Sequence, residues 1–163
     1  PASRTGIVVA AEPMVDAITA FNATAALAPA ATGPMIIEPL LASGELDLLC
    51  RDVIRPYYEQ RSRQAVGWLR DECHGLPLRI HRPEGAFFLW LWFQGLPVPS
   101  QELYRRLKAR GVLVLSGHHF FPGLEEPWPH RDECLRINCS QSPESVRDGI
   151  RLIAEEARRA YGA

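Results

Sequence analysis

The chain has 163 residues, enough for one domain with a hydrophobic core or for a small domain that carries part of another. Hydrophobic residues make up 47% of the sequence and charged residues 23%, as in ordinary globular proteins, and the formal net charge is -1. A chain this close to neutral has no overall positive field that would attract nucleic acid or an acidic membrane.

The cysteine pattern and the hydrophobic pattern indicate a reduced, cytoplasmic setting. The four cysteines form no CxxC pair, and the sequence has neither a signal peptide nor a run of eighteen apolar residues. Cysteines and histidines also lack the spacing that zinc ligands require, which disfavours a zinc site.

The first segment, residues 1–45, is expected to be the remnant of a larger domain. Residues 7–11 are short, apolar and β-branched, which predicts a strand. Pro13 suits the first turn of a helix, and an apolar side chain recurs every three or four residues from Met14 to Ala25, which predicts one buried helical face. A strand followed by a helix is half of an α/β unit, but the sequence offers that strand no neighbour.

Residues 46–74 carry a long helical pattern. Pro56 lies inside this pattern and predicts a kink, because proline lacks the N–H that a helix interior needs. A helix this long commonly connects two bodies, so we place a domain boundary along it. Its charged residues are most simply a solvated face.

Residues 75–163 predict a small α+β domain with helices on one face of a sheet. The run 86–93 is apolar at every position and predicts a central strand buried on both faces. Ser100 is expected to cap the helix that follows, and Gly111 to end it. The other predicted elements are strands over 78–81, 112–115 and 134–139, and a final helix from Ser142-Pro143.

Arg136 lies in the strand 134–139, where alternation sends Leu135 and Ile137 to one face and Arg136 to the other. Taken alone, the arginine faces either bulk water or a cleft. His118 and His119 lie on a glycine-flanked loop, where binding residues are often found, and an ordinary polar loop is an equally good interpretation. The basic cluster of residues 105–110 sits at a helix C-terminus, where cations are favoured, and indicates a solvated face.

Several segments together resemble the C-terminal part of the class I/II, fold-type I aminotransferases that depend on pyridoxal 5'-phosphate (PLP). The resemblance covers essentially the whole chain and rests on residues 1–6, 83–93, 103–112, 117–124, 127–130 and 135–138. It implies an α/β parent fold, of which this chain would hold the α+β small domain and a strand-helix remnant of the large domain. It also implies amino-group transfer between valine or another small amino acid and a 2-oxo acid such as pyruvate.

The resemblance also implies roles for particular residues. Arg4 would hold the cofactor phosphate, and Arg136 would bind the α-carboxylate of the substrate, because the planar guanidinium donates paired hydrogen bonds to such anions. The loop that contains Gly117, His118 and Phe120 would border the substrate pocket. Whether His118 or Phe120 touches the substrate stays open.

The family's Schiff-base lysine would lie upstream of Pro1, and Lys108, the only lysine, matches no catalytic position. We therefore expect the full-length protein to be a homodimeric enzyme and the chain alone to be inert. Two alternatives remain: an aminotransferase with another substrate preference, and a non-catalytic ligand-binding or oligomerisation module like those found in some transcription regulators.

Overall fold

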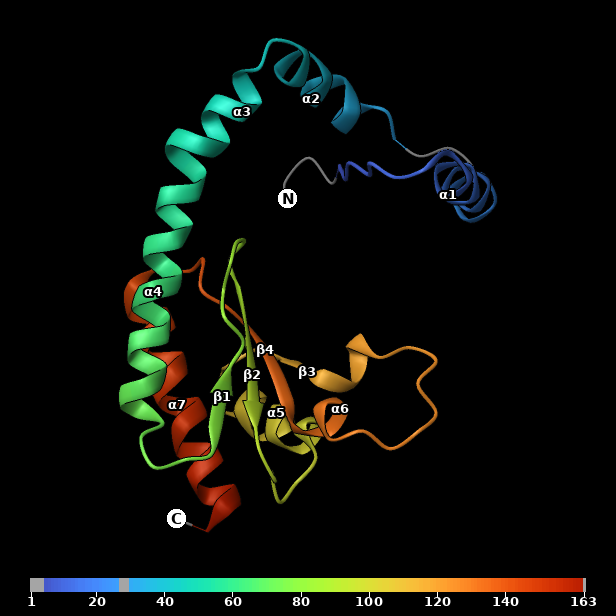
Figure 1. The fold of residues 1–163 in the computed structure, drawn as a ribbon. Helices are drawn as coiled ribbons and strands as arrows, with labels where there is room; N and C mark the ends of the chain where they lie inside the picture. The colour runs from blue at the N-terminus through green and yellow to red at the C-terminus, as the bar shows by residue number, and fades with distance from the viewer. Residues whose placement is uncertain (1–4, 27–29, 163) are drawn as a thin grey trace. The chain divides into compact units, whose positions relative to one another are not determined.

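A computed structural model describes residues 5–26 and 30–162, which divide into two compact units, Pro1–Val53 and Ile54–Ala163 (Figure 1). The first unit contains helices α1 (Glu12–Ala25), α2 (Thr32–Ala42) and α3 (Glu45–Leu49). The second unit contains the sheet and most of the buried residues. Each unit is described by itself.

The first unit departs from the sequence prediction at its start. Residues 5–11 form neither helix nor strand, so the strand expected over 7–11 is not formed. The physical reason is that a strand needs a neighbour for its N–H and C=O groups. Helix α1 is present as predicted, but the face expected to be buried is open: Met14 is 57% exposed and Phe21 69%.

The long helical pattern is confirmed and contains one irregularity. Helix α3, a π-helical turn η1 (Cys50–Ile54) and helix α4 (Arg55–Glu72) follow one another directly. Pro56 lies in the first turn of α4. Because a proline ring clashes with the carbonyl four residues earlier, the wider turn immediately before it is the expected way to relieve the clash. The domain limits at residues 45 and 75 stay a prediction.

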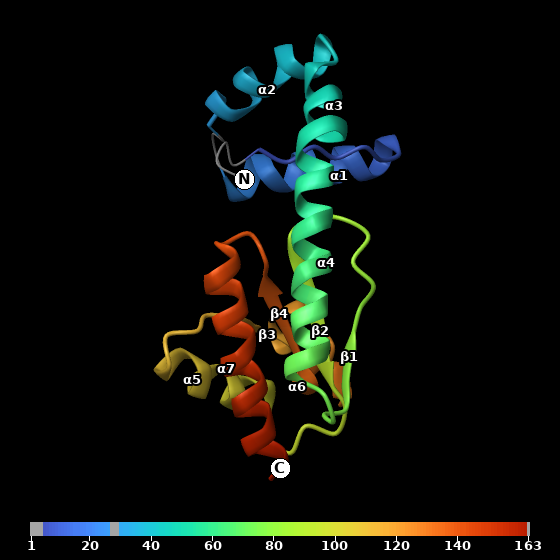
Figure 2. The ribbon, with the colours of Figure 1, turned by 90° about the vertical axis from the view of Figure 1, so that its left-hand side faces the viewer.

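The second unit is the predicted α+β layer. Its antiparallel sheet has the order β1-β2-β4-β3, formed by β1 (Leu78–Ile80), β2 (Phe88–Phe93), β4 (Cys134–Asn138) and β3 (Leu115–Ser116). Helices α4 and α7 (Pro143–Tyr161) lie side by side over one face of this sheet (Figure 2). The core lies between these layers and contains Ala65, Leu69, Leu89, Leu91, Phe93, Leu135, Ile137, Ile150 and Ile153.

Strand β2 is central, as predicted, but it is buried on only one face. Leu89, Leu91 and Phe93 are buried, whereas the alternate residues Phe88 and Trp90 are only partly covered. The prediction of a strand buried on both faces is therefore wrong. The aromatic side chains point away from the core side of the sheet because side chains alternate along a strand.

Helix α5 (Ser100–Ala109) ends as predicted, with Gly111 in the left-handed region at φ +81°. Its start differs from the prediction, because Pro99 is the N-cap and Ser100 makes no capping bond. The Ser100 hydroxyl is fully buried, and its Oγ lies 2.7 Å from Ser116 Oγ on β3. Tertiary contact with β3 thus replaces the local role that the sequence suggested.

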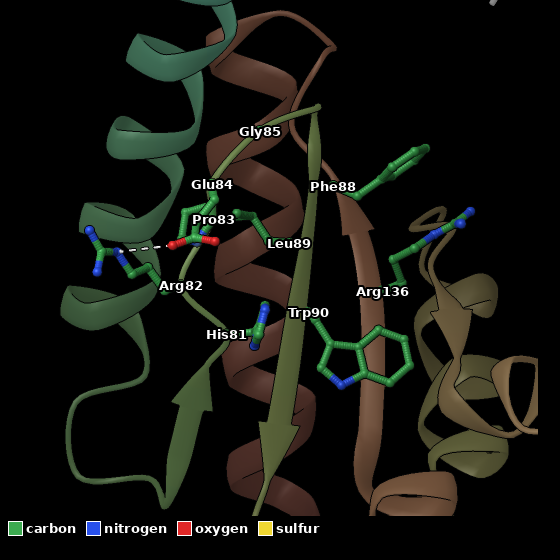
Figure 3. Close-up of a pocket in the computed structure, with 9 residues that line it drawn as sticks. All are labelled: His81, Arg82, Pro83, Glu84, Gly85, Phe88, Leu89, Trp90 and Arg136. Carbon is green, nitrogen blue, oxygen red and sulfur yellow. Dashed lines mark ion pairs between the residues drawn. The ribbon is translucent and has the colours of Figure 1, made fainter. Parts of the chain in front are cut away.

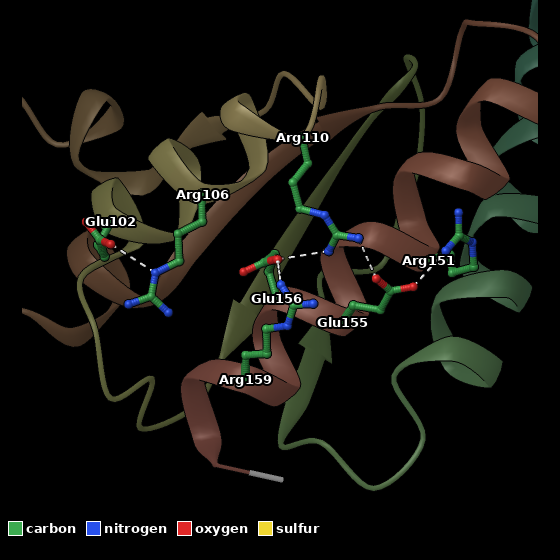
Figure 4. A network of polar contacts seen from close by, with 7 residues as sticks. All are labelled: Glu102, Arg106, Arg110, Arg151, Glu155, Glu156 and Arg159. Carbon is green, nitrogen blue, oxygen red and sulfur yellow. Dashed lines mark hydrogen bonds and ion pairs between the residues drawn. The ribbon is translucent and has the colours of Figure 1, made fainter.

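An ionic network joins the end of α5 to α7 (Figure 4). Arg110 donates to Glu155 at 2.6 Å and to Glu156 at 2.8 Å. Arg159 also donates to Glu156, at 2.7 Å. Glu156 is only 3% exposed, and its carboxylate is satisfied by these two arginines.

This network predicts a pH dependence of stability. The hydrogen bond from Arg110 is the main reason why the pKa of Glu155 lies below its usual value. A carboxylate with a lowered folded-state pKa stabilises the fold above its unfolded-state pKa and loses that contribution as the pH falls through the folded-state value. We expect the melting temperature to drop less between about pH 5 and pH 3 in Glu155→Gln than in the unchanged chain, measured by circular dichroism. Arg110→Gln should flatten the profile similarly, and an equally steep drop in both variants would contradict the assignment.

Candidate functional site

Arg136 lies in the middle of β4, on the face opposite the core. In the sheet register it is paired with Trp90 on β2 and with Leu115 on β3. Its neighbours in sequence, Leu135 and Ile137, point into the core, as alternation predicts. The side chain is half-buried, so of the two interpretations left open by the sequence, the cleft is the one that fits.

Two aromatic rings lie against the Arg136 guanidinium. Its Cζ lies 4.1 Å from the centroid of the Phe88 ring and 4.9 Å from that of Phe120. Among the residues that the structure describes, no carboxylate pairs with this guanidinium and no acceptor takes a hydrogen bond from it. A half-buried positive charge without a counterion has its hydrogen-bond donors free for an anion.

A pocket of about 230 Å³ opens beside Arg136 (Figure 3). Its size is below the range of roughly 300–1,000 Å³ that is usual for drug-sized ligands, which favours a small molecule. Arg82, the other arginine in its lining, lies 3.8 Å from Glu84, and both side chains are largely exposed. The lining residues are His81, Arg82, Pro83, Glu84, Gly85, Phe88, Leu89, Trp90 and Arg136.

The predicted site residue Gly117 begins the 3-10 turn η2 (Gly117–Phe120) and is buried. A Cβ atom at this position would lie 2.8 Å from the carbonyl oxygen of His130 and 2.9 Å from that of Arg131, both on helix α6 (Pro129–Glu133). Gly117 therefore allows η2 to approach the backbone of α6 closely. It does not line the pocket.

The other two predicted loop residues, His118 and Phe120, make different contacts in the structure. His118 Nδ1 lies 2.7 Å from Ser116 Oγ, and that oxygen also lies within hydrogen-bond distance of Ser100 Oγ. The centroid of the His118 ring lies 3.8 Å from that of the His119 ring. Burial, and then the charge of His119, lowers the pKa of His118 below its usual value. Phe120 contacts Arg136, whereas His118 bonds to Ser116. Neither Phe120 nor His118 is part of the pocket lining.

Further aromatic contacts extend from Phe120 over the face of the sheet that carries Arg136. The Trp90 ring meets Phe120 edge-on at 5.0 Å and Phe121 at 6.2 Å. Phe121 in turn meets Trp128 at 4.9 Å. Sequence reasoning missed Phe88 and Trp90 as site residues. The signal was present, because alternation along β2 places both on the face of Arg136.

The remaining predicted site residue, Arg4, lies outside the described residues. Lys108 is exposed on α5, with its Nζ 6.0 Å from the centroid of the Tyr104 ring, and it is not part of the pocket lining. Within residues 5–26 and 30–162, no group of three or more His, Cys, Asp or Glu side chains is arranged to hold a metal ion. Over the same residues, none of the helices has the length and apolar character needed to span a membrane.

Comparison with known proteins finds similar sequences and similar structures among aminotransferases. No family model matches the chain. Valine--pyruvate aminotransferase of Escherichia coli K12 is 44% identical over 161 residues, which cover 99% of this chain and 39% of that protein. The crystal structure of valine-pyruvate aminotransferase AvtA from Salmonella typhimurium LT2 is 42% identical, with a TM-score of 0.80, over 94% of this chain and 40% of that one.

Two further matches are a second aminotransferase and a transcriptional regulator. A putative amino-acid aminotransferase from Psychrobacter arcticum 273-4 is 40% identical, with a TM-score of 0.84, over 99% of this chain and 37% of that one. The HTH-type transcriptional regulator TauR of Rhodobacter capsulatus is 30% identical over 159 residues, which cover 97% of this chain and 31% of the regulator. The chain thus spans about two-fifths of the curated aminotransferase it matches and about a third of the regulator.

The similar region includes strand β2, the η2 turn and strand β4, which carry Phe88, Phe120 and Arg136 respectively. The α+β layer is the fold that the solved aminotransferases share with this chain. In sequence and in fold, the chain resembles the C-terminal part of valine-pyruvate aminotransferase, as its motifs predict.

Proposed function

We propose that this chain is the C-terminal part of a PLP-dependent aminotransferase, and that Arg136 binds the α-carboxylate of the substrate. The observation that carries the proposal is the half-buried guanidinium beside a small pocket, without a carboxylate partner among the described residues. The similarity to valine-pyruvate aminotransferase supports a small amino acid such as valine as amino donor and a 2-oxo acid such as pyruvate as acceptor.

The chemistry of the site suits this role. A guanidinium can donate two parallel hydrogen bonds to a carboxylate, which fixes both the position and the orientation of the bound molecule. Fixing the carboxylate also fixes the Cα–H bond that must break in amino transfer. Phe88 and Trp90 contribute apolar walls to the pocket, which suit a short hydrocarbon side chain.

PLP would supply the electron sink for cleavage of the Cα–H bond. Of this chain's residues, Arg4 is our candidate for holding the cofactor phosphate. Exposed Lys108 is not part of the pocket lining, so we assign it no role toward the cofactor. The described residues fit the binding of an amino-acid substrate, and we propose that the cofactor is attached by parts of a longer, homodimeric protein. The chain alone would then be inactive.

The amino-donor preference of the full-length protein tests the proposed substrate. With pyruvate as acceptor, we expect turnover of valine and of other small apolar amino acids, because the pocket beside Arg136 offers aromatic walls and one unpaired cation. The measurement is the initial rate of alanine formation with each donor. Strong turnover of aspartate together with none of valine would contradict the proposed preference.

A second candidate function follows from the similarity to TauR, a transcriptional regulator. In that case, the same pocket would bind a carboxylate ligand without chemical turnover, as part of a ligand-binding or oligomerisation module. The sequence upstream of Pro1 discriminates the two functions. A DNA-binding segment there, with carboxylate binding but no amino transfer by the full-length protein, would favour the regulator.

A further inference from the structure

Arg136 is flanked by one aromatic ring from each side of its own strand. In the sheet, β4 lies between β2 and β3. Phe88 therefore reaches the guanidinium from β2, and Phe120 reaches it from η2, the turn that follows β3. Figure 3 shows the Phe88 and Arg136 side chains extending to the same side of the sheet.

Aromatic rings hold an arginine in a different way from a carboxylate. A ring face attracts the cation through its quadrupole and leaves the N–H groups without an acceptor. An acidic partner would fix the guanidinium too, but it would occupy the donors and compete with an incoming anion. The two rings at Arg136 thus contact the guanidinium while its charge and donors stay available.

Phe120 is itself held in place by the fold. Its ring packs edge-on against Trp90 at 5.0 Å. The turn that carries it is fixed at one end by the close approach of Gly117 to α6, and by the bond between His118 and Ser116. A ring mounted on such a turn has a defined position before any ligand arrives.

We propose that Phe88 and Phe120 are positioning residues, which hold the Arg136 guanidinium ready for the carboxylate of a small organic acid. A free arginine side chain samples many rotamers, so a guanidinium that is already ordered loses less conformational entropy on binding. The choice of a carboxylate as the ligand rests on the function proposed above. The ordering of Arg136 by the two rings does not depend on that function.

The experiment uses the 163-residue chain and two nuclear magnetic resonance readouts. The first is the order of the Arg136 Nε–Hε vector, with its signal assigned by its loss in Arg136→Lys. The second is the dissociation constant of 3-methylbutanoate, a small monocarboxylate, followed by the same signal. The variants are Phe88→Leu and Phe120→Leu, which keep an apolar side chain but remove the ring at partly exposed positions. Phe88→Tyr and Phe120→Tyr keep the ring.

Phe121→Leu is the matched control, because the same change is made one residue away, on a ring that packs against Trp90 and Trp128. We expect each leucine variant at Phe88 or Phe120 to lower the order of Arg136 and to weaken 3-methylbutanoate binding about three- to tenfold. The tyrosine variants should keep the order of Arg136, and Phe121→Leu should stay close to the unchanged chain in both readouts.

The proposal is overturned if Arg136 keeps its order in both leucine variants, or if Phe121→Leu loosens it equally. A third outcome separates the two proposals. If the leucine variants loosen Arg136 but the unchanged chain does not bind 3-methylbutanoate, the positioning role stands and the carboxylate assignment of the proposed function fails.

Discussion

Replacing Arg136 with alanine in the full-length protein is expected to lower amino-transfer turnover far more than it weakens cofactor binding. Each charge-assisted hydrogen bond is worth roughly 1.5–3 kcal/mol, or about one to two decades in rate. The geometry supports a two-bond contact, because the guanidinium has no carboxylate partner among the described residues and lies beside the pocket. The measurements are kcat/KM for valine with pyruvate, and the affinity for PLP by absorbance titration.

Arg82→Ala provides the matched control for this prediction. Arg82 is the other arginine in the pocket lining, but it is largely exposed and lies 3.8 Å from Glu84. An exposed ion pair of this kind contributes little, so its loss should leave kcat/KM nearly unchanged. An unchanged rate in Arg136→Ala, or an equal loss in Arg82→Ala, would refute the carboxylate-binding role of Arg136.

The fold was predictable where the pattern of a segment agrees with its surroundings. Helix α7 follows the apolar period of its sequence, and Val146, Ile150 and Ile153 are buried as that period indicates. From Leu135 to Asn138, strand β4 alternates between the buried Leu135 and Ile137 and the more exposed Arg136 and Asn138, as period two indicates. The predictions failed where a partner decides the outcome: residues 7–11 form no strand, and the Ser100 hydroxyl turns to Ser116 instead of capping its helix.

The candidate site was predictable only in part, for the same reason. Alternation along β4 sends Arg136 out of the core, and that much is local. The rings that hold it are not local, because Phe88 and Phe120 reach it from β2 and from the turn after β3. Sheet order, which no single segment encodes, decides that these three residues meet.

Replacing Gly117 with alanine is expected to destabilise the second unit by about 1–3 kcal/mol, the usual cost of forcing extra atoms into a packed site. The added Cβ would lie 2.8 Å and 2.9 Å from two backbone oxygens of α6 and 3.1 Å from the Cβ of Cys134. Backbone atoms cannot swing aside as a flexible side chain can. Either η2 or α6 must shift, and a shift of η2 carries Phe120 away from Arg136. Chemical denaturation of the chain measures the cost.

Gly67→Ala is the control that separates this crowding from the general effect of the substitution. Gly67 lies inside helix α4, and nothing stands within 4 Å of the position its Cβ would take. Alanine there should stabilise the chain by about 0.5–1 kcal/mol, because alanine favours a helix more than glycine does. Opposite signs at the two positions would show that Gly117 is required for the space it leaves open. If the Gly117→Ala variant is as stable as the unchanged chain, then η2 does not need its close approach to α6. In that case, this contact does not hold Phe120 against Arg136.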